Sequence, residues 1–269
     1  FANEPILTLT GPLALCQLLE TPILNLIGFA TLVATNASRM VTAANGKDCV
    51  EFGIRRAQGP DGGLTASEYA YLGGLLELPM FSVEGYTEFR QLVQCPTPTL
   101  LRLRASTTQE FELNGIKIKE ATLKWRTKLG LEKAHAGELA AFLMYARAFP
   151  DGVVTLIDSF STLDSGIQNT ISLCAALAEA GIKNFGCRLD SGDLRDYAKY
   201  ISFMRKCKAI WAKVFPFNIP LKVLASNDLN EESITEMEKN GFEIDTYAIG
   251  TNIATCQKQP ALGLVYKLV

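Results

Sequence analysis

The sequence has only one histidine and two tryptophans, and none of its cysteines are paired as Cys-x-x-Cys. Its seven cysteines are odd in number and scattered, so we expect buried, reduced thiols and neither a structural disulfide nor a zinc site. No charge of one sign dominates, because 26 basic and 28 acidic side chains leave a net charge of -2. This balance argues against a protein that coats nucleic acid, but it allows a local basic pocket for a small anion.

Signals for secretion or membrane insertion are also scarce. The chain starts Phe1-Ala2-Asn3-Glu4, without an initiator methionine or the basic start of a secretory signal, so we expect an excerpt of a longer protein. The reduced thiols indicate a cytosolic one. The most apolar stretch is residues 13–33. It predicts two adjacent buried helices and no membrane span, because it is interrupted by Gln17, Glu20, Pro22 and Asn25.

What is present is an alternation of short apolar runs and helical stretches in the second half. Strands are predicted at residues 153–157, 184–189, 221–225 and 247–249. Helices are predicted at residues 169–180, from Asp193 to about Ala212, and from Asn230, with Gly181 and Gly241 closing the first and third. Such alternation predicts an α/β fold with a parallel sheet covered on both faces, either doubly wound or part of a (β/α) barrel.

The first half is less regular. Residues 137–149 have the apolar spacing of a core-facing helix, and residues 49–54 predict a fifth strand that ends at Arg55-Arg56. Residues 59–63, Gly-Pro-Asp-Gly-Gly, have the composition of a flexible loop. Residues 75–122 lack the strand–helix rhythm, and we expect a loop or a divergent segment there.

Polar residues follow every predicted strand. These are Arg55 and Arg56, Asp158, Arg188 and Asp190, Asn227, and Gly250-Thr251. Because parallel strands end at one edge of the sheet, where α/β folds bind ligands, we expect these residues to converge. Taken singly, each has a plainer interpretation: a turn and helix cap at residues 190–193, a β-turn at Gly250-Thr251, and a solvated pair at Arg55-Arg56. His135 has no acid or nucleophile at a recognised spacing, so we expect a structural or solvent-facing role.

Residues 51–63 read Glu-Phe-Gly-Ile-Arg-Arg-Ala-Gln-Gly-Pro-Asp-Gly-Gly, and the motif continues through residues 66–74. With residues 18–22, 188–193 and 249–251, this string resembles the nicotinate phosphoribosyltransferases, which are type II phosphoribosyltransferases. The resemblance covers roughly residues 1–74 and 123–269. It implies that residues 49–74 and 123–269 form part of an irregular (β/α) barrel. Residues 1–48 would be the remnant of a second, flanking α/β domain, and residues 75–122 an atypical insert.

The resemblance also implies a reaction. The family makes nicotinate mononucleotide from nicotinate and phosphoribosyl pyrophosphate, with ATP and Mg²⁺, for NAD biosynthesis, and its members are homodimers. By resemblance, the site residues would divide as follows: Arg188 for the nicotinate carboxylate, Thr251 and Gly250 for the sugar phosphate, Arg55 for pyrophosphate, and Asp158 and Asp190 beside the ribose. The carboxylates would face the positive charge that develops as pyrophosphate leaves.

One family element has no counterpart after Gly74. In the family a Gly-Thr-x-x-His-Ser segment carries the histidine that ATP phosphorylates. An alternative function is therefore an inactive partial form that binds ligand or pairs with a complete subunit. A relative that uses nicotinamide or quinolinate is a third possibility, which the Glu-Phe-Gly-x-Arg-Arg-Ala-Gln-Gly string disfavours.

Overall fold

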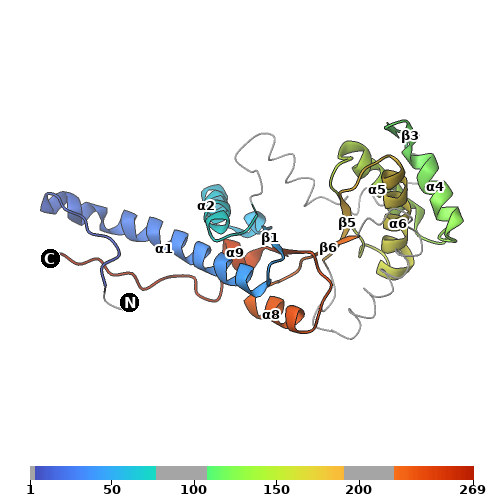
Figure 1. Cartoon of the computed structure of the whole chain (residues 1–269). Coiled ribbons are helices and arrows are strands. Elements are labelled where there is room, and N and C mark those ends of the chain that lie inside the picture. Colours follow the sequence, from blue (N-terminus) through green and yellow to red (C-terminus); the bar gives the residue numbers. More distant parts are fainter. Residues whose placement is uncertain (1–3, 77–107, 191–220) are drawn as a thin grey trace.

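A computed structural model describes residues 4–76, 108–190 and 221–269 (Figure 1). Its centre is one parallel sheet, in which all five predicted strands are present: β1 (Asp48–Glu51), β4 (Val153–Leu156), β5 (Phe185–Leu189), β6 (Lys222–Ala225) and β7 (Thr246–Ile249). The strand order is β1-β7-β6-β5-β4. The first strand thus lies beside the last, as in a (β/α) barrel. The predicted α/β class, with a parallel sheet, is confirmed.

The two faces of the sheet differ. Strand register places Val50, Leu224 and Ala248 on one face, where they form a small apolar cluster with Phe52 and Val154. The opposite face belongs to the main core, through residues such as Cys187, Val223 and Tyr247. Helices cover this second face. The first face carries the small apolar cluster.

The helices of the second half begin and end where local sequence predicts. Helix α6 (Ile167–Glu179) is followed by Gly181 at φ +81°, and α8 (Glu231–Lys239) is followed by Gly241 at φ +69°. Asn230 caps α8 in a reciprocal pair of hydrogen bonds with Ser233. Helix α5 (Ala136–Ala148) packs its apolar side chains in the core, as predicted. The helical stretch predicted up to Ala212 lies outside the described residues.

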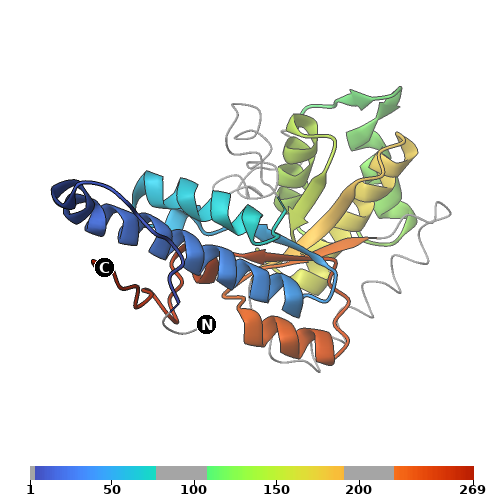
Figure 2. The ribbon, with the colours of Figure 1, turned by 60° about the vertical axis from the view of Figure 1, so that its left-hand side comes forward.

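The prediction of two buried helices at residues 13–33 is wrong. A single helix, α1 (Leu13–Ala43), runs through Pro22, which removes one backbone donor without ending the helix. Its second half packs against α2 and α8, but its first half projects beyond the sheet (Figure 2), and Leu18 is 74% exposed. By length and composition alone, α1 is long and apolar enough to cross a membrane. Core helices of soluble proteins can have the same length and composition. The C-terminal segment runs along it, and the Tyr266 hydroxyl donates to the Cys16 carbonyl.

Loop predictions are wrong at residues 59–63 and at residues 112–122. Residues 59–63 form the first turn of α2 (Gly59–Leu72), because Pro60 is preset for a helix start and Asp61 complements its positive end. Within the segment predicted as loop, β2 (Glu112–Leu113) and β3 (Ile116–Lys117) form a hairpin that leads into α4 (Ile118–Lys128). Residues 77–107 lie outside the described residues.

The cysteines in the described part of the chain agree with the expectation of buried thiols. They are buried thiols: Cys16, Cys49, Cys174, Cys187 and Cys256. Burial raises the pKa of the Cys49 thiol to about 12, so it is a neutral, unreactive group at physiological pH.

Candidate functional site

The carboxyl ends of β4 and β5 are joined by a pair of acidic residues. Asp158 follows β4, and its Oδ2 accepts a hydrogen bond of 3.0 Å from the backbone N–H of Asp190, which follows β5. Both residues are partly exposed. The structure therefore brings these two predicted residues together at the sheet edge.

Arg188, near the end of β5, is the most buried cation of this edge, with 8% of its surface exposed. Its Nε donates to Ser226 Oγ at 3.0 Å, and its Nη2 lies 2.8 Å from Asp190 Oδ1. The guanidinium carbon lies 5.2 Å from the centre of the Phe52 ring. A planar cation held by a hydroxyl, a carboxylate and an aromatic ring has a fixed orientation, which suits recognition of a planar anion.

Ser226 connects this network to a third strand. Its hydroxyl lies within hydrogen-bond distance of both Asp190 Oδ1 and the Leu189 carbonyl. Asp190 Oδ1 is thereby occupied by Arg188 and Ser226, and Asp158 Oδ2 by a backbone N–H. Within the described part of the chain, the second oxygen of each carboxylate has no partner in this network. Among described residues, no group of three or more His, Cys, Asp or Glu side chains could hold a metal.

The ends of β1 and β7 pack closely beside this network. The Phe52 N–H donates to the Ile249 carbonyl at 2.8 Å. A Cβ atom placed on Gly53 would lie 2.4 Å from the Gly250 carbonyl oxygen, so only glycine fits between these two turns. Gly250 precedes α9 (Thr251–Ala254), whose first residue Thr251 is partly exposed. Arg55 lies in the short 3₁₀ turn η1 (Ile54–Arg56) and is exposed.

A buried carboxyl group supports the β1 turn from the helix-facing side of the sheet. Glu51 is 3% exposed, and its oxygens accept hydrogen bonds from the Gly53 N–H and the Ser67 hydroxyl on α2. Burial raises the pKa of Glu51 to about 7, although both hydrogen bonds act to lower it. Glu51 thus ties the turn that carries Phe52 and Gly53 to α2.

Sequence reasoning missed three residues of this site: Phe52, Ser226 and Glu51. Glu51 and Phe52 lie in the predicted strand at residues 49–54, and Ser226 follows the one at residues 221–225. The alternation of side chains along a strand is the pattern that could have identified them. Register places Phe52 and Ser226 on the same face as Arg188, and Glu51 on the other. Asn227, one of the predicted strand-end residues, is exposed at φ +88°, and its neighbour Ser226 makes the contacts instead. Residues 191–193 lie outside the described residues.

His135 has a structural role. Its Nδ1 accepts a hydrogen bond from the Glu138 N–H at the start of α5, and its ring stacks on Phe160 with centroids 3.9 Å apart. Its position as a helix cap explains its place in the sequence without a catalytic function.

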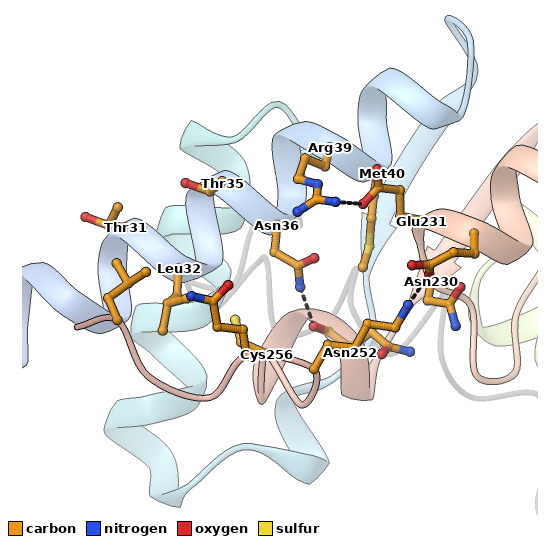
Figure 3. Close-up of a pocket in the computed structure, with 14 residues that line it drawn as sticks. Thr31, Leu32, Thr35, Asn36, Arg39, Met40, Asn230, Glu231, Asn252 and Cys256 are labelled. Atoms are coloured by element: carbon orange, nitrogen blue, oxygen red, sulfur yellow. Dashed lines mark hydrogen bonds and ion pairs between the residues drawn. The ribbon is translucent and has the colours of Figure 1, made fainter. Parts of the chain in front are cut away.

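A separate pocket of about 230 Å³ lies between α1, α8 and α9 (Figure 3). Its charged groups neutralise each other in pairs, since Arg39 lies 2.8 Å from Glu231 and Lys258 pairs with Glu232. Asn36 donates to the Asn252 carbonyl across its floor. None of the predicted site residues is among its described lining residues, and it has no unpaired cation for a phosphate.

No family model matches the chain. The similar proteins found by sequence and by structure share one enzyme name. A nicotinate phosphoribosyltransferase of Caenorhabditis elegans is 41% identical over 291 residues, which cover 100% of this chain and 51% of the relative. One from Dictyostelium discoideum is 42% identical over 278 residues, covering 100% and 47%. The crystal structure of human nicotinic acid phosphoribosyltransferase matches with a TM-score of 0.64 and 35% identity, over 89% of this chain and 51% of that one.

The sequence match extends through the whole chain, beyond the ranges on which the motif resemblance rests. The chain spans about half the length of the curated relatives it matches. The shared fold and the identity over the full chain make this chain similar to the nicotinate phosphoribosyltransferases, over about half of their length.

Proposed function

We propose that this chain catalyses phosphoribosyl transfer from phosphoribosyl pyrophosphate to nicotinate, giving nicotinate mononucleotide for NAD synthesis. The observation that carries the proposal is the buried, oriented guanidinium of Arg188 beside two carboxylates at the sheet edge. Nicotinate is a planar aromatic carboxylate, and a stacked arginine recognises both its charge and its plane. The relatives named above carry the same activity in their names.

In the proposed reaction the ring nitrogen of nicotinate attacks C1 of the ribose. The C1–N bond forms, the C1–O bond to pyrophosphate breaks, and the electron pair of that bond leaves with pyrophosphate. Positive charge develops on the ribose as the bond breaks. Asp158 and Asp190, placed beside the sugar, stabilise this charge more in the transition state than in the ground state.

In this proposal the phosphate groups bind at the ends of the neighbouring strands, β7 and β1. Gly250 and Thr251 present a backbone turn and a hydroxyl to the sugar phosphate, and exposed Arg55 binds pyrophosphate. Mg²⁺ fits the two carboxylates, because this ion is commonly held by one or two carboxylates together with substrate phosphates. When bound, Mg²⁺ neutralises charge on the departing pyrophosphate.

The experiment is an assay of the purified chain with nicotinate, phosphoribosyl pyrophosphate and Mg²⁺, with and without ATP. Mononucleotide above the blank supports the proposal, and its absence under both conditions refutes activity of this form. A rate that rises with ATP supports coupling to ATP, which we propose from the family resemblance. Replacing nicotinate by nicotinamide or quinolinate tests the base, and size-exclusion chromatography tests the proposed homodimer.

A further inference from the structure

A second buried carboxyl group lies behind the loop that follows β4. Glu138 on α5 and Asn169 on α6 both have 0% of their surface exposed. The Ser165 hydroxyl, in the π-helical turn η4 (Thr162–Gly166), donates to Glu138 Oε2, and Asn169 Nδ2 donates to the same oxygen at 3.0 Å. Three elements therefore meet at one oxygen of Glu138.

The orientation of the Asn169 amide is fixed by a second bond. Its Nδ2 also donates to the His135 carbonyl at 3.0 Å, and a carbonyl accepts only from a donor. Turning the amide over would set its Oδ1 against that carbonyl. The nitrogen must face His135 and Glu138 Oε2, and Oδ1 is left as an acceptor.

Two buried acceptors then lack a donor. They are Glu138 Oε1 and Asn169 Oδ1, which have no hydrogen-bond partner within the described structure. A buried carboxylate oxygen without a donor is strongly unfavourable, and so is a buried amide oxygen without one. One proton on Oε1, donated to Oδ1, satisfies both atoms at once and completes a two-bond acid–amide pair.

We propose that Glu138 is a neutral carboxylic acid paired with Asn169, and that this pair is a positioning element for the loop that carries Asp158. Ser165 links the Glu138–Asn169 pair to this loop. Its hydroxyl donates to Glu138 and accepts from the His135 N–H at 3.0 Å. The next residue, Gly166, packs directly on the end of β4, where an added Cβ would lie 1.9 Å from the Ile157 carbonyl oxygen. Asp158 follows Ile157.

The charges around Glu138 agree with the neutral form. Burial, the largest effect, raises the pKa of Glu138, and the nearby charge of Asp158 raises it further. The hydrogen bonds from Ser165 and Asn169 and the proximity of His135 act in the opposite direction. A neutral Glu138 also spares Asp158 a like charge, which keeps the Asp158 carboxylate available for a ligand.

The first test is infrared difference spectroscopy of the whole chain labelled with ¹³C in glutamate carboxyl groups. Spectra are recorded at pH 8, above the pKa of about 7 of the other buried acid, Glu51. The wild type is expected to show a protonated-carboxyl band that Glu138→Gln removes. Glu51→Gln and Glu132→Gln, the latter an exposed residue just before α5, are expected to keep it. If the wild type and Glu138→Gln share the same spectrum in this region, the carboxyl is ionised and the proposal fails.

The second test compares two substitutions by thermal melting between pH 5 and 9. Glutamine supplies the missing donor with its own amide, so Glu138→Gln is expected to melt near the wild type at pH 5 and above it at pH 9. Glu138→Ala removes the pair and is expected to melt lower at every pH. Equal losses in both variants would instead indicate a carboxylate that needs its charge, with a water as donor, and would overturn the assignment.

The positioning role rests on the proposed function and has its own readout. Glu138→Ala is expected to lower kcat for mononucleotide formation, and Glu138→Gln to restore it. An unchanged kcat in Glu138→Ala overturns the positioning role. A wild-type chain without activity refutes the proposed function, while the infrared and melting results still decide the acid–amide pair.

Discussion

The Arg188 guanidinium lies 5.2 Å from the centre of the Phe52 ring, although β7 and β6 separate the strands that carry these residues. In a flat sheet, strands three positions apart are about 14 Å distant, so the two side chains lean toward each other across a shared face. This convergence agrees with the curvature of a barrel segment, and it places a cation beside the ring of Phe52, which belongs to the small apolar cluster of that face.

The shape of the Arg188 side chain is predicted to matter more than its charge. Arg188→Lys keeps the charge but loses the planar fork that joins Ser226 and Asp190. We expect nicotinate to bind about 10–100-fold more weakly, the loss of one hydrogen bond to a charged group. Calorimetric titration with nicotinate measures this.

The matched control for that change is Arg39→Lys on α1, because its side chain is 63% exposed. It should leave nicotinate binding unaltered. Nicotinamide, which has no carboxylate, should bind Arg188→Lys and wild type with similar affinity. Equal weakening for both ligands would mean that Arg188 holds the fold and not the carboxylate.

Removing the charge of Asp158 is predicted to slow catalysis without unfolding the chain. In Asp158→Asn the amide oxygen still accepts from the Asp190 N–H, so melting should hardly change. The loss of negative charge beside the ribose should lower kcat about 100-fold. Asp151→Asn is the control, because Asp151 is exposed at the opposite end of β4. A kcat in Asp158→Asn that matches the control would exclude Asp158 from the transition state.

Features set by neighbouring residues could be predicted from the sequence, and features set by distant packing could not. Asn230 and Gly241 mark the ends of α8 because capping is local chemistry. Glycine content at residues 59–63 predicted a loop, but Pro60 at the second position of α2 favours a helix start. Apolar composition in the first half of α1 predicted burial, yet composition does not say whether another element covers a helix.

The candidate site shows the same division. Strand ends identified Asp158, Arg188 and Asp190, because parallel strands share one edge. The Phe52–Arg188 contact depends on sheet curvature, and the Glu138–Asn169 pair joins residues 31 positions apart. Neither relationship follows from local pattern.

Ionisation of Glu51 is predicted to make stability fall with rising pH. Its pKa is raised from 4.5 to about 7 in the folded chain, so the folded state binds more protons than the unfolded state between these values. The contribution of Glu51 to stability is therefore largest below about pH 4.5, and about 3 kcal/mol of it is lost as pH rises through 7. Glu51→Gln removes this titration and should flatten the dependence in urea unfolding at pH 5 and 8. Glu68→Gln, exposed on α2, should retain it. Parallel slopes in wild type and Glu51→Gln would contradict a protonated Glu51.

Close packing at Gly53 is predicted to couple the β1 turn to the Gly250-Thr251 turn. Gly53 has φ -97°, which alanine also adopts, so Gly53→Ala tests space alone. The added methyl would meet the Gly250 carbonyl oxygen at 2.4 Å and Ala254 Cβ at 2.7 Å, both in or next to α9. We expect a loss of about 1–3 kcal/mol in unfolding free energy, because a crowded site must shift its backbone.

Phosphoribosyl pyrophosphate should also bind Gly53→Ala more weakly, since the displaced turn carries Thr251. Gly263→Ala is the control, having no atom within 4 Å of the new methyl. If Gly53→Ala binds phosphoribosyl pyrophosphate as tightly as Gly263→Ala while losing stability, the turn at Gly250 is not part of the phosphate site.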